Sequence, residues 1–261
     1  MLAELHNKIS TNSNNLERSE DQLTGDFFGT LRYLPFEMAM KTILSKVRFK
    51  KEEIFQDWET ILRQEKGYMT GMEFWFRHEV EGDIDLLVSL SSIKLGIEVK
   101  YLSRLSSEDE IPADVIDYEE SANQLARYSR MIADISKEKT SYLILLAPFK
   151  LMREVEQSLL NRSIIAPGVN LGFLSWEDVL DSLEELDISL MELGQQMIVE
   201  DLIKLLIKRD FLRYKGISKE ILVKNVTQEF YMFNKVKNKT NTLNWPDNQL
   251  SEGDFYVFSN Q

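Results

Sequence analysis

Residues 81–101 read EGDIDLLVSLSSIKLGIEVKY, a stretch that predicts two short apolar strands joined by a tight polar turn at residues 91–92. Three ionisable side chains, Asp85, Glu98 and Lys100, fall where a fully buried strand carries none. Burying such groups is costly unless they are paired or bind a ligand. We therefore expect the fold and the functional site to be organised around this stretch.

Strand alternation predicts which of these side chains share a face. Glu98 and Lys100 are two residues apart, so both project from one face of the strand and Val99 projects from the other. If the two strands pair antiparallel, Asp85 at the start of the first lies across from the end of the second, and two carboxylates converge beside one lysine. Such a pair suits a hard cation such as Mg2+, and the lysine can hold a water or stabilise developing negative charge. Taken alone, Glu-x-Lys in a strand is more often a solvent-exposed ion pair.

This constellation resembles the PD-(D/E)XK nuclease superfamily, whose signature is an Asp ahead of an apolar strand and an Asp/Glu-x-Lys on the next strand. The resemblance implies that Asp85 and Glu98 bind Mg2+ or Mn2+ and that Lys100 activates or positions the attacking water. Asp83 is the competing metal ligand, and Asp85 is preferred because it directly precedes the apolar triplet. The similarity in the order of elements covers residues 18–187.

Apolar residues at helical spacing between Ser19 and Pro35 predict the first helix, with Ser19 or Thr24 as its N-cap. Glu20 lies early in that helix, where many members of the superfamily carry a further active-site carboxylate. The resemblance therefore implies that Glu20 is a further metal or water ligand. The alternative is a favourable charge near a helix N-terminus.

Residues 118–135 predict another helix, in which Gln124 and Tyr128 are four apart and share a face. In the RecB-like branch of the superfamily, a Gln-x-x-x-Tyr on the helix after the Glu-x-Lys strand borders the active site. The resemblance therefore adds Gln124 and Tyr128 to the expected site residues. The acidic, serine-containing segment 103–114 predicts a mobile loop just after the site.

The remaining patterns predict an α/β protein with a restriction-endonuclease-like mixed central sheet flanked by helices. Further helices are expected at 36–47, 50–63, 150–160, 175–186 and 190–214, and further strands at 72–80, 141–147 and 169–175. In the strand at 72–80, Phe74 and Phe76 are expected on one face and Trp75 on the other. The expected domains are an N-terminal arm at 1–17, the nuclease-like domain at 18–187 and a helical, partly basic C-terminal region at 188–261.

Composition excludes several kinds of site. The chain has no Cys and only two His, which rules out disulfides, thiolate zinc sites and a histidine metal site. No Gly-rich phosphate loop is present, so an energy-driven step would need a partner. No apolar stretch approaches 18 residues and a signal-peptide core is lacking, so we expect a cytoplasmic protein without a membrane contact.

The charge of the chain is unevenly distributed. A net charge of -12 argues against coating nucleic acid by bulk electrostatics. Residues 201–240, however, hold ten Lys and Arg against four Asp and Glu. That segment is either a nucleic-acid contact surface or the solvated basic face of a helix.

The resulting expectation is a metal-dependent nuclease that hydrolyses phosphodiester bonds of nucleic acid, with DNA as the expected substrate. By analogy, it would be the nuclease subunit of a restriction or antiphage defence system and would act with a helicase or other partner subunit. A homo-oligomer, in which two copies pair their active sites, is the other assembly expected. The alternative is a catalytically inactive nuclease-fold subunit that binds nucleic acid or a partner protein.

Overall fold

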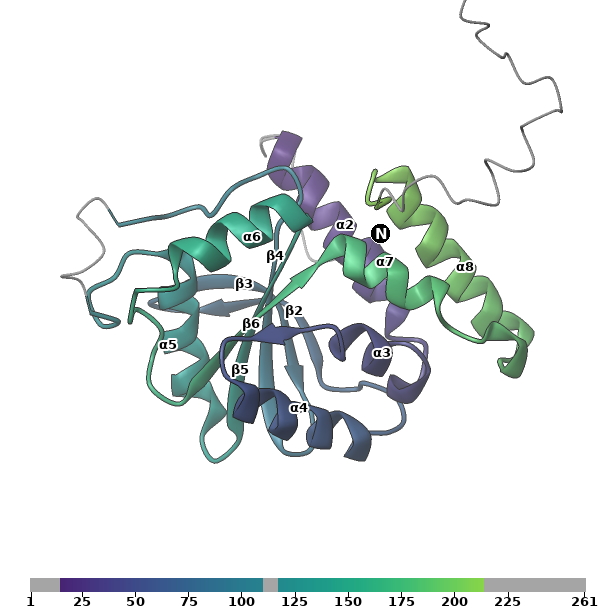
Figure 1. The fold of residues 1–261 in the computed structure, drawn as a ribbon, viewed down its shortest axis with the longest axis horizontal. Helices are drawn as coiled ribbons and strands as arrows, with labels where there is room; N and C mark the ends of the chain where they lie inside the picture. Colours follow the sequence, from purple (N-terminus) through teal and green to yellow (C-terminus); the bar gives the residue numbers. More distant parts are fainter. Residues whose placement is uncertain (1–14, 110–116, 214–261) are drawn as a thin grey trace, which may run out of the picture. The chain divides into compact units, whose positions relative to one another are not determined.

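The computed structural model describes residues 15–109 and 117–213 (Figure 1). A six-stranded mixed sheet runs through this part of the chain. Its strands are β1 (Arg48–Phe49), β2 (Met72–His78), β3 (Gly82–Ser89), β4 (Ile93–Val99), β5 (Thr140–Ala147) and β6 (Val169–Ser175). The protein is therefore of the α/β class, as the sequence predicts.

The strands lie in the order β1-β6-β5-β4-β3-β2. The neighbours β2, β3 and β4 are antiparallel and joined by short turns, whereas β4, β5 and β6 are parallel. Parallel neighbours need a crossover connection, which usually carries a helix. Here α5 (Gln124–Ser136) connects β4 to β5, and α6 (Phe149–Ser158) connects β5 to β6.

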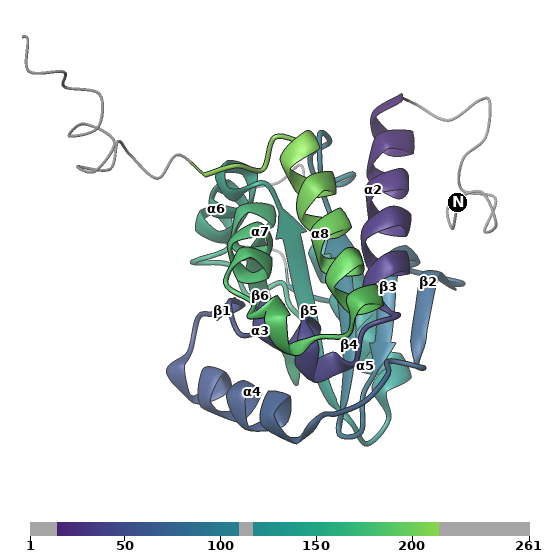
Figure 2. The same ribbon diagram turned by 90° about the vertical axis from the view of Figure 1, so that its right-hand side faces the viewer.

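Helices cover both faces of the sheet (Figures 1 and 2). The other helices are α2 (Asn15–Leu31), α3 (Met40–Leu44), α4 (Glu52–Gln64), α7 (Trp176–Glu184) and α8 (Leu193–Lys208), with 3-10 turns η1 (Phe36–Met38) and η2 (Ile188–Leu190). One core cluster contains the buried residues of α2, α3, α4, α7 and α8, and the other contains those of α5 and α6. Because both faces are covered, β5 is a continuous apolar run.

Helix boundaries differ from those that the sequence predicts. The first helix already includes Asn15, so Ser19 and Thr24 lie inside it and neither caps it. Thr24 is instead fully buried, and its Oγ1 has no hydrogen-bond partner in the described part of the chain. The helix expected at 118–135 begins at Gln124, because the Asn123 side chain accepts a hydrogen bond from the Leu125 N–H and caps it there.

Two expected long helices are shorter or broken. The segment 36–47 forms η1 and α3, which are separated by the non-helical backbone of Ala39. The segment 190–214 begins with the end of η2, and α8 starts at Leu193 and ends at Lys208. By contrast, the helix expected at 175–186 is found as α7, and the Ser175 side chain caps it by accepting a hydrogen bond from the Asp178 N–H.

The strand β2 does not alternate as expected. Phe74 and Trp75 both belong to the core cluster on the α2 face, whereas Phe76 packs against the cluster on the α5 face. The prediction that Phe74 and Phe76 share a face is therefore wrong. Trp75 has a φ of 49°, a left-handed conformation that interrupts the pleat, and its Nε1 donates to Asp21 Oδ1 of α2 at 2.9 Å.

The helix α8 belongs to the same compact unit as the sheet. It packs against α2 and α7, and the unit extends through Arg213, beyond the boundary expected at residue 187. The expected arm at residues 1–17 lies largely outside the described residues, as does the C-terminal region from residue 214. Within the described ranges, no helix is both long enough and apolar enough to cross a membrane.

Candidate active site

The candidate site lies at the carboxyl end of β4, between β3 and β5 in the interior of the sheet. Asp85 belongs to β3, Glu98 is the next-to-last residue of β4, and Lys100 follows β4 directly. Val99 joins the core cluster on the α2 face, whereas Glu98 contacts Gln124 of α5 on the other face. The predicted alternation of Glu98 and Val99 is therefore confirmed.

The ladder between β3 and β4 stops just before the site. Its last pair is Leu86 with Ile97, and the same register would next place Asp85 opposite Glu98 and then Ile84 opposite Val99. Instead, the Val99 N–H donates to Asp85 Oδ2 at 2.8 Å. A side-chain carboxylate thus takes a backbone amide that a continued ladder would use, so the strands separate where the functional groups lie.

The strand β3 also changes face at Asp85. Ile84 belongs to the core cluster on the α5 face, but Leu86 belongs to the cluster on the α2 face. Residues two apart in a regular strand share a face. The register with β2 places Asp85 opposite Trp75, so both strands are irregular at the same point.

The carboxyl groups of Asp85 and Glu98 face each other and perturb each other. Burial raises the pKa of Asp85 well above its usual value, and the charge of Glu98 raises it further. Burial also raises the pKa of Glu98, although Lys100 opposes this. Oε2 of Glu98 is buried and has no hydrogen-bond partner among the described residues. A shared proton or a cation between the two groups would relieve this repulsion.

The ammonium of Lys100 bridges two carboxylates. Its Nζ lies 2.7 Å from Glu98 Oε1 and 3.1 Å from Glu20 Oε1. Burial alone would lower the pKa of Lys100, but the carboxylates of Glu98, Glu20 and Asp85 outweigh burial and raise it. Lys100 is therefore held as a cation and is suited to stabilising negative charge, not to accepting a proton.

Glu20 joins this cluster from the early part of α2. Its Oε1 contacts Lys100, and its Oε2 accepts hydrogen bonds from the Tyr101 N–H at 2.9 Å and the Ser103 hydroxyl at 2.7 Å. Both oxygens are thus engaged. In this geometry Glu20 orients Lys100 and anchors the chain after β4, and it reaches a metal only if these contacts rearrange.

Gln124 and Tyr128 lie on the face of α5 that covers Glu98. Gln124 Nε2 donates to Glu98 Oε1 at 2.8 Å and to the Tyr128 hydroxyl at 3.1 Å. The Tyr128 hydroxyl in turn donates to the Asp83 carbonyl at 2.5 Å. Burial raises the pKa of Tyr128, as does the charge of Glu98, so its hydroxyl stays neutral and serves as a donor.

The structure places Asp85, not Asp83, beside Glu98. The Asp83 side chain is 40% exposed, and its Oδ1 lies 3.9 Å from Arg77 Nε. The backbone carbonyl of Asp83 joins the cluster through Tyr128. This geometry supports the preference for Asp85 over Asp83 as the candidate ligand.

Two carboxylates, not three, are arranged toward a common point. In the part of the chain that the structure describes, no three acidic or histidine side chains form a group that could hold a metal ion. The chemistry of the pair nevertheless fits a divalent cation, because Glu98 has a buried oxygen without a partner among the described residues and both pKa values are raised. A hard cation with retained waters needs only one or two protein carboxylates.

Sequence reasoning missed the part played by the segment after the site. In the described part of the expected mobile loop, Ser103 holds Glu20 and the Ser106 N–H donates to Gln124 Oε1 at 2.9 Å. Farther along, Asp109 and Glu108 both form ion pairs with Arg162. Ser103 and Ser106 thus bind two residues of the site, and Arg162 holds the segment farther along. The sequence shows only that this loop contains serine and acidic residues, and that composition does not reveal which residues they contact.

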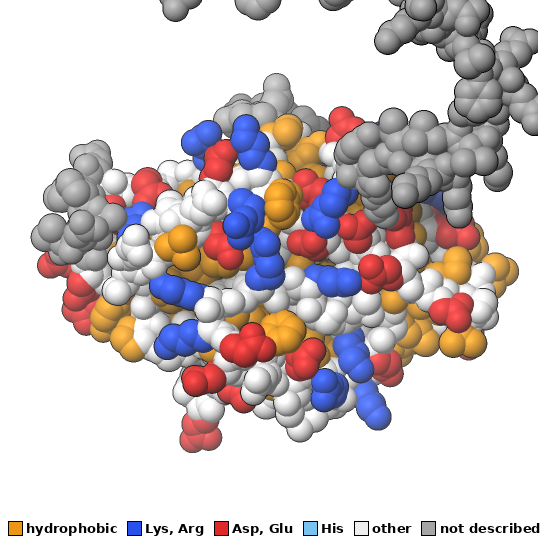
Figure 3. All heavy atoms as spheres, in the orientation of Figure 1, with side chains coloured by type: hydrophobic (Ala, Val, Ile, Leu, Met, Phe, Trp, Pro, Cys, Tyr) orange, Lys and Arg blue, Asp and Glu red, His pale blue; other side chains and the backbone are white. Residues whose placement is uncertain are grey.

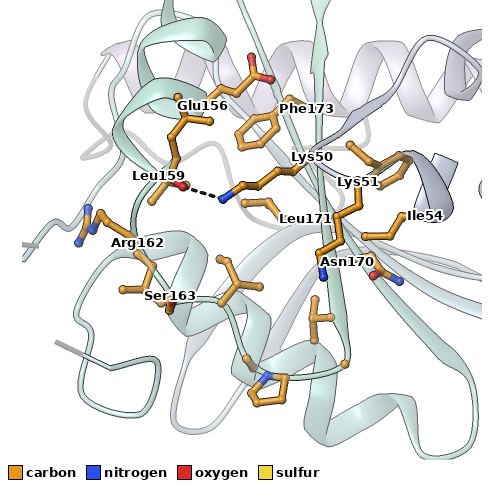
Figure 4. Close-up of a pocket in the computed structure, with 18 residues that line it drawn as sticks. Lys50, Lys51, Ile54, Glu156, Leu159, Arg162, Ser163, Asn170, Leu171 and Phe173 are labelled. Carbon is orange, nitrogen blue, oxygen red and sulfur yellow. Dashed lines mark hydrogen bonds between the residues drawn. The ribbon is translucent and has the colours of Figure 1, made fainter. Parts of the chain in front are cut away.

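A separate cavity lies away from these residues. It has a volume of about 660 Å³ and opens between the first half of β6, the start of α4 and the segment after α6 (Figure 4). Lys50 crosses it and donates to the Leu160 carbonyl at 2.6 Å. None of the candidate site residues lines this cavity.

The basic C-terminal segment is described only through Arg213, so Lys215 lies outside the described residues. Arg213 is engaged by Asp178 at 2.9 Å and by Asp181 at 3.2 Å, and the Arg209 guanidinium lies over the Tyr101 ring. Positive and negative side chains are interspersed over the face in Figure 3. Part of the expected basic surface is thus used in contacts within the protein.

Comparisons with known proteins do not add to this picture. The chain matches no protein-family model, no curated protein and no solved structure. Function is therefore inferred from the geometry of the cluster and from the motif resemblance.

Proposed function

We propose that the protein is a metal-dependent nuclease with a restriction-endonuclease-like fold, which hydrolyses phosphodiester bonds of nucleic acid. The observation that carries this proposal is the facing pair of Asp85 and Glu98 with Lys100 beside them. Both carboxyls have raised pKa values, and one oxygen of Glu98 is buried without a partner among the described residues. Perturbed ionisable groups of this kind concentrate at functional sites.

Asp85 and Glu98 would hold the cation. When bound there, Mg2+ or Mn2+ would polarise a phosphate and lower the pKa of a bound water. Lys100 stays an ammonium because of its carboxylate neighbours, so it would orient the attacking water and stabilise negative charge on the phosphate. Glu20 fixes the lysine from one side. Gln124 fixes Glu98 from the other, and Tyr128 ties Gln124 to the strand that carries Asp85.

DNA is the proposed substrate, and a role in a restriction or antiphage defence system is proposed by analogy alone. A helicase or another subunit would supply any energy-driven step. Part of the basic segment is engaged internally. Few of the described basic residues of this segment are then left for the substrate, and the chain as a whole is negatively charged. A partner that presents the nucleic acid would fit both facts.

A second candidate function is supported by the closure of the site. The side chains of Glu98, Lys100 and Glu20 are only 3%, 6% and 10% exposed, and Lys100 pairs with both carboxylates. A phosphodiester cannot reach such a buried cluster in this arrangement. A nuclease-fold subunit that binds nucleic acid or a protein without cleaving would keep this closed arrangement.

Cleavage assays distinguish the two functions. The purified protein is incubated with plasmid, linear duplex, single-stranded DNA and RNA, with and without Mg2+ or Mn2+. Metal-dependent cleavage that Glu98→Gln abolishes supports the nuclease. Binding without cleavage under every metal condition supports the second function. Cleavage that persists unchanged in Glu98→Gln would show that the activity does not arise at this site.

A further inference from the structure

The site depends on the spacing between two strands whose backbone ladder stops short of it, and which are joined there through the Val99 N–H and the Asp85 side chain. The β3–β4 ladder ends at Leu86 and Ile97, before Asp85 and Glu98 are reached. Backbone hydrogen bonds between these strands therefore do not fix the distance between the two carboxylates. The first residues of β3 pair with β2 on their other side, from Gly82 with His78 to Ile84 with Phe76, and a further element contacts the turn before them.

That element is α5, which contacts both strands. On the β4 side, Gln124 Nε2 donates to Glu98. On the β3 side, the Tyr128 hydroxyl donates to the Asp83 carbonyl, and Arg127 Nη2 donates to the Glu81 carbonyl. One rigid helix thus spans the gap where the ladder is missing.

The strongest contact in this set is a two-bond ion pair. Arg130 Nε donates to Glu81 Oε1 at 2.7 Å, and Arg130 Nη2 donates to Glu81 Oε2 at 2.9 Å. The two side chains are 21% and 11% exposed. Arg130 Nη1 also donates to the carbonyls of Tyr118 and Ser121, which ties the segment before α5 to the same point. Such paired charged hydrogen bonds constrain direction as well as distance.

The backbone at this point leaves little freedom. Gly82, between Glu81 and Asp83, has a φ of +97°, and a Cβ on it would lie 2.7 Å from Arg127 Nη2. Arg127 and Arg130 therefore approach the turn between β2 and β3 closely. Asp85 is three positions after Gly82 in the chain.

We propose that Arg130, acting through Glu81, is a positioning residue that sets the separation of Asp85 and Glu98 for binding one divalent cation. This inference rests on the proposed metal site. It assigns Arg130 no contact with the substrate or the metal. Its effect passes from α5 to the turn before β3 and from there to Asp85.

The test is a calorimetric titration with Mn2+, performed on folded protein and read independently of cleavage. Arg130→Ala and the more conservative Glu81→Gln are both expected to weaken Mn2+ binding by up to about tenfold, less than the loss of a direct partner of a metal ligand costs, because their contacts reach Asp85 only through the turn before β3. Arg130→Lys keeps the charge but loses the fork, so its affinity is expected to fall between those of the parent and Arg130→Ala.

Arg48→Ala is the matched control, because Arg48 joins β1 to α6 through Glu156 at 3.5 Å, away from the carboxylate pair. It removes a partly buried ion pair between elements and is expected to leave Mn2+ affinity unchanged. If Arg130→Ala does not fold, Glu81→Gln carries the test. Parent-like affinity in folded Glu81→Gln overturns the positioning role alone, whereas a parent that binds no Mn2+ overturns the metal site and the inference with it.

Discussion

The two ends of β4 each carry a lysine that faces a carboxylate, but in different surroundings. At the amino end, Lys94 Nζ lies 3.8 Å from Glu73 Oε1, and the two side chains are 16% and 53% exposed. At the carboxyl end, Lys100 Nζ lies 2.7 Å from Glu98 Oε1, with 6% and 3% exposed. A solvent-exposed pair contributes about 0–1 kcal/mol to stability, whereas a buried pair must first offset a desolvation cost of several kcal/mol per ion. The pair of Lys94 and Glu73 is therefore an ordinary, partly exposed ion pair, whereas the buried pair of Lys100 and Glu98 indicates a functional site.

The largest expected difference between the two ends is in cleavage. Lys100→Ala is expected to lower metal-dependent cleavage by about 100- to 1,000-fold, because it removes the cation that stabilises developing charge. Lys94→Ala, in the same strand, is expected to cleave like the parent. Rates are measured under single-turnover conditions after circular dichroism has shown that both variants are folded. Equal rates for the two variants would place the chemistry elsewhere.

A second difference separates two acids of the same strand. Asp85→Asn is expected to weaken Mn2+ binding by at least about tenfold, the lower end of what losing even an outer partner costs. Asp83→Asn is expected to change it little, since its side chain points to solvent near Arg77. Calorimetric titration of both variants measures the order. The reverse order would make Asp83 the ligand.

A third difference concerns stability and pH. The folded-state pKa values of Asp85 and Glu98 are raised. Their contribution to stability is therefore fully present below the unfolded values of about 4, and it is lost as pH rises through the folded values. Asp85→Asn removes this loss because the new side chain does not ionise, and its amide oxygen still accepts the Val99 N–H. Without metal, the variant is therefore expected to be about 1 kcal/mol more stable than the parent at pH 7.

Urea unfolding of Asp85→Asn and the parent at a series of pH values checks this expectation. The gain of Asp85→Asn over the parent should shrink as the pH falls toward 4. A gain that stays constant with pH would mean that the repulsion between the two carboxylates is not its source.

The smallest expected effect lies at the amino end. Lys94→Met is expected to change the free energy of unfolding by no more than about 0.5 kcal/mol, because its partner Glu73 is half exposed. Thermal unfolding provides the measurement. A loss comparable to that of Lys100→Met would remove the distinction between the two ends of the strand.

The sequence was sufficient for features that depend on local pattern. The turn at residues 91–92 and the alternation in β4 predict Glu98 beside Lys100, and the four-residue spacing predicts Gln124 beside Tyr128. The continuous apolar run of β5 predicts a strand buried on both faces, and it is one. In each case, the backbone geometry of one element determines which side chains share a face.

The sequence was insufficient where contacts between distant elements decide the geometry. Nothing near Trp75 predicts its left-handed backbone, which accompanies the indole contact with Asp21 of α2. The fork between Arg130 and Glu81 joins residues 49 apart, and each alone reads as a charged surface residue. The helix α5 was expected from residue 118, because apolar spacing does not reveal the cap at Asn123 that starts it at Gln124.

The hydrogen bond from the Val99 amide to Asp85 turns one backbone proton into a reporter. Amides in the middle of β4 are protected from exchange with solvent by neighbouring strands, but the Val99 amide owes its protection to a side chain. A cation that draws the Asp85 carboxylate away would change the chemical shift and the deuterium exchange rate of this single amide. An isotope-labelled sample could therefore follow the occupancy of the site in solution without a substrate and without any altered residue.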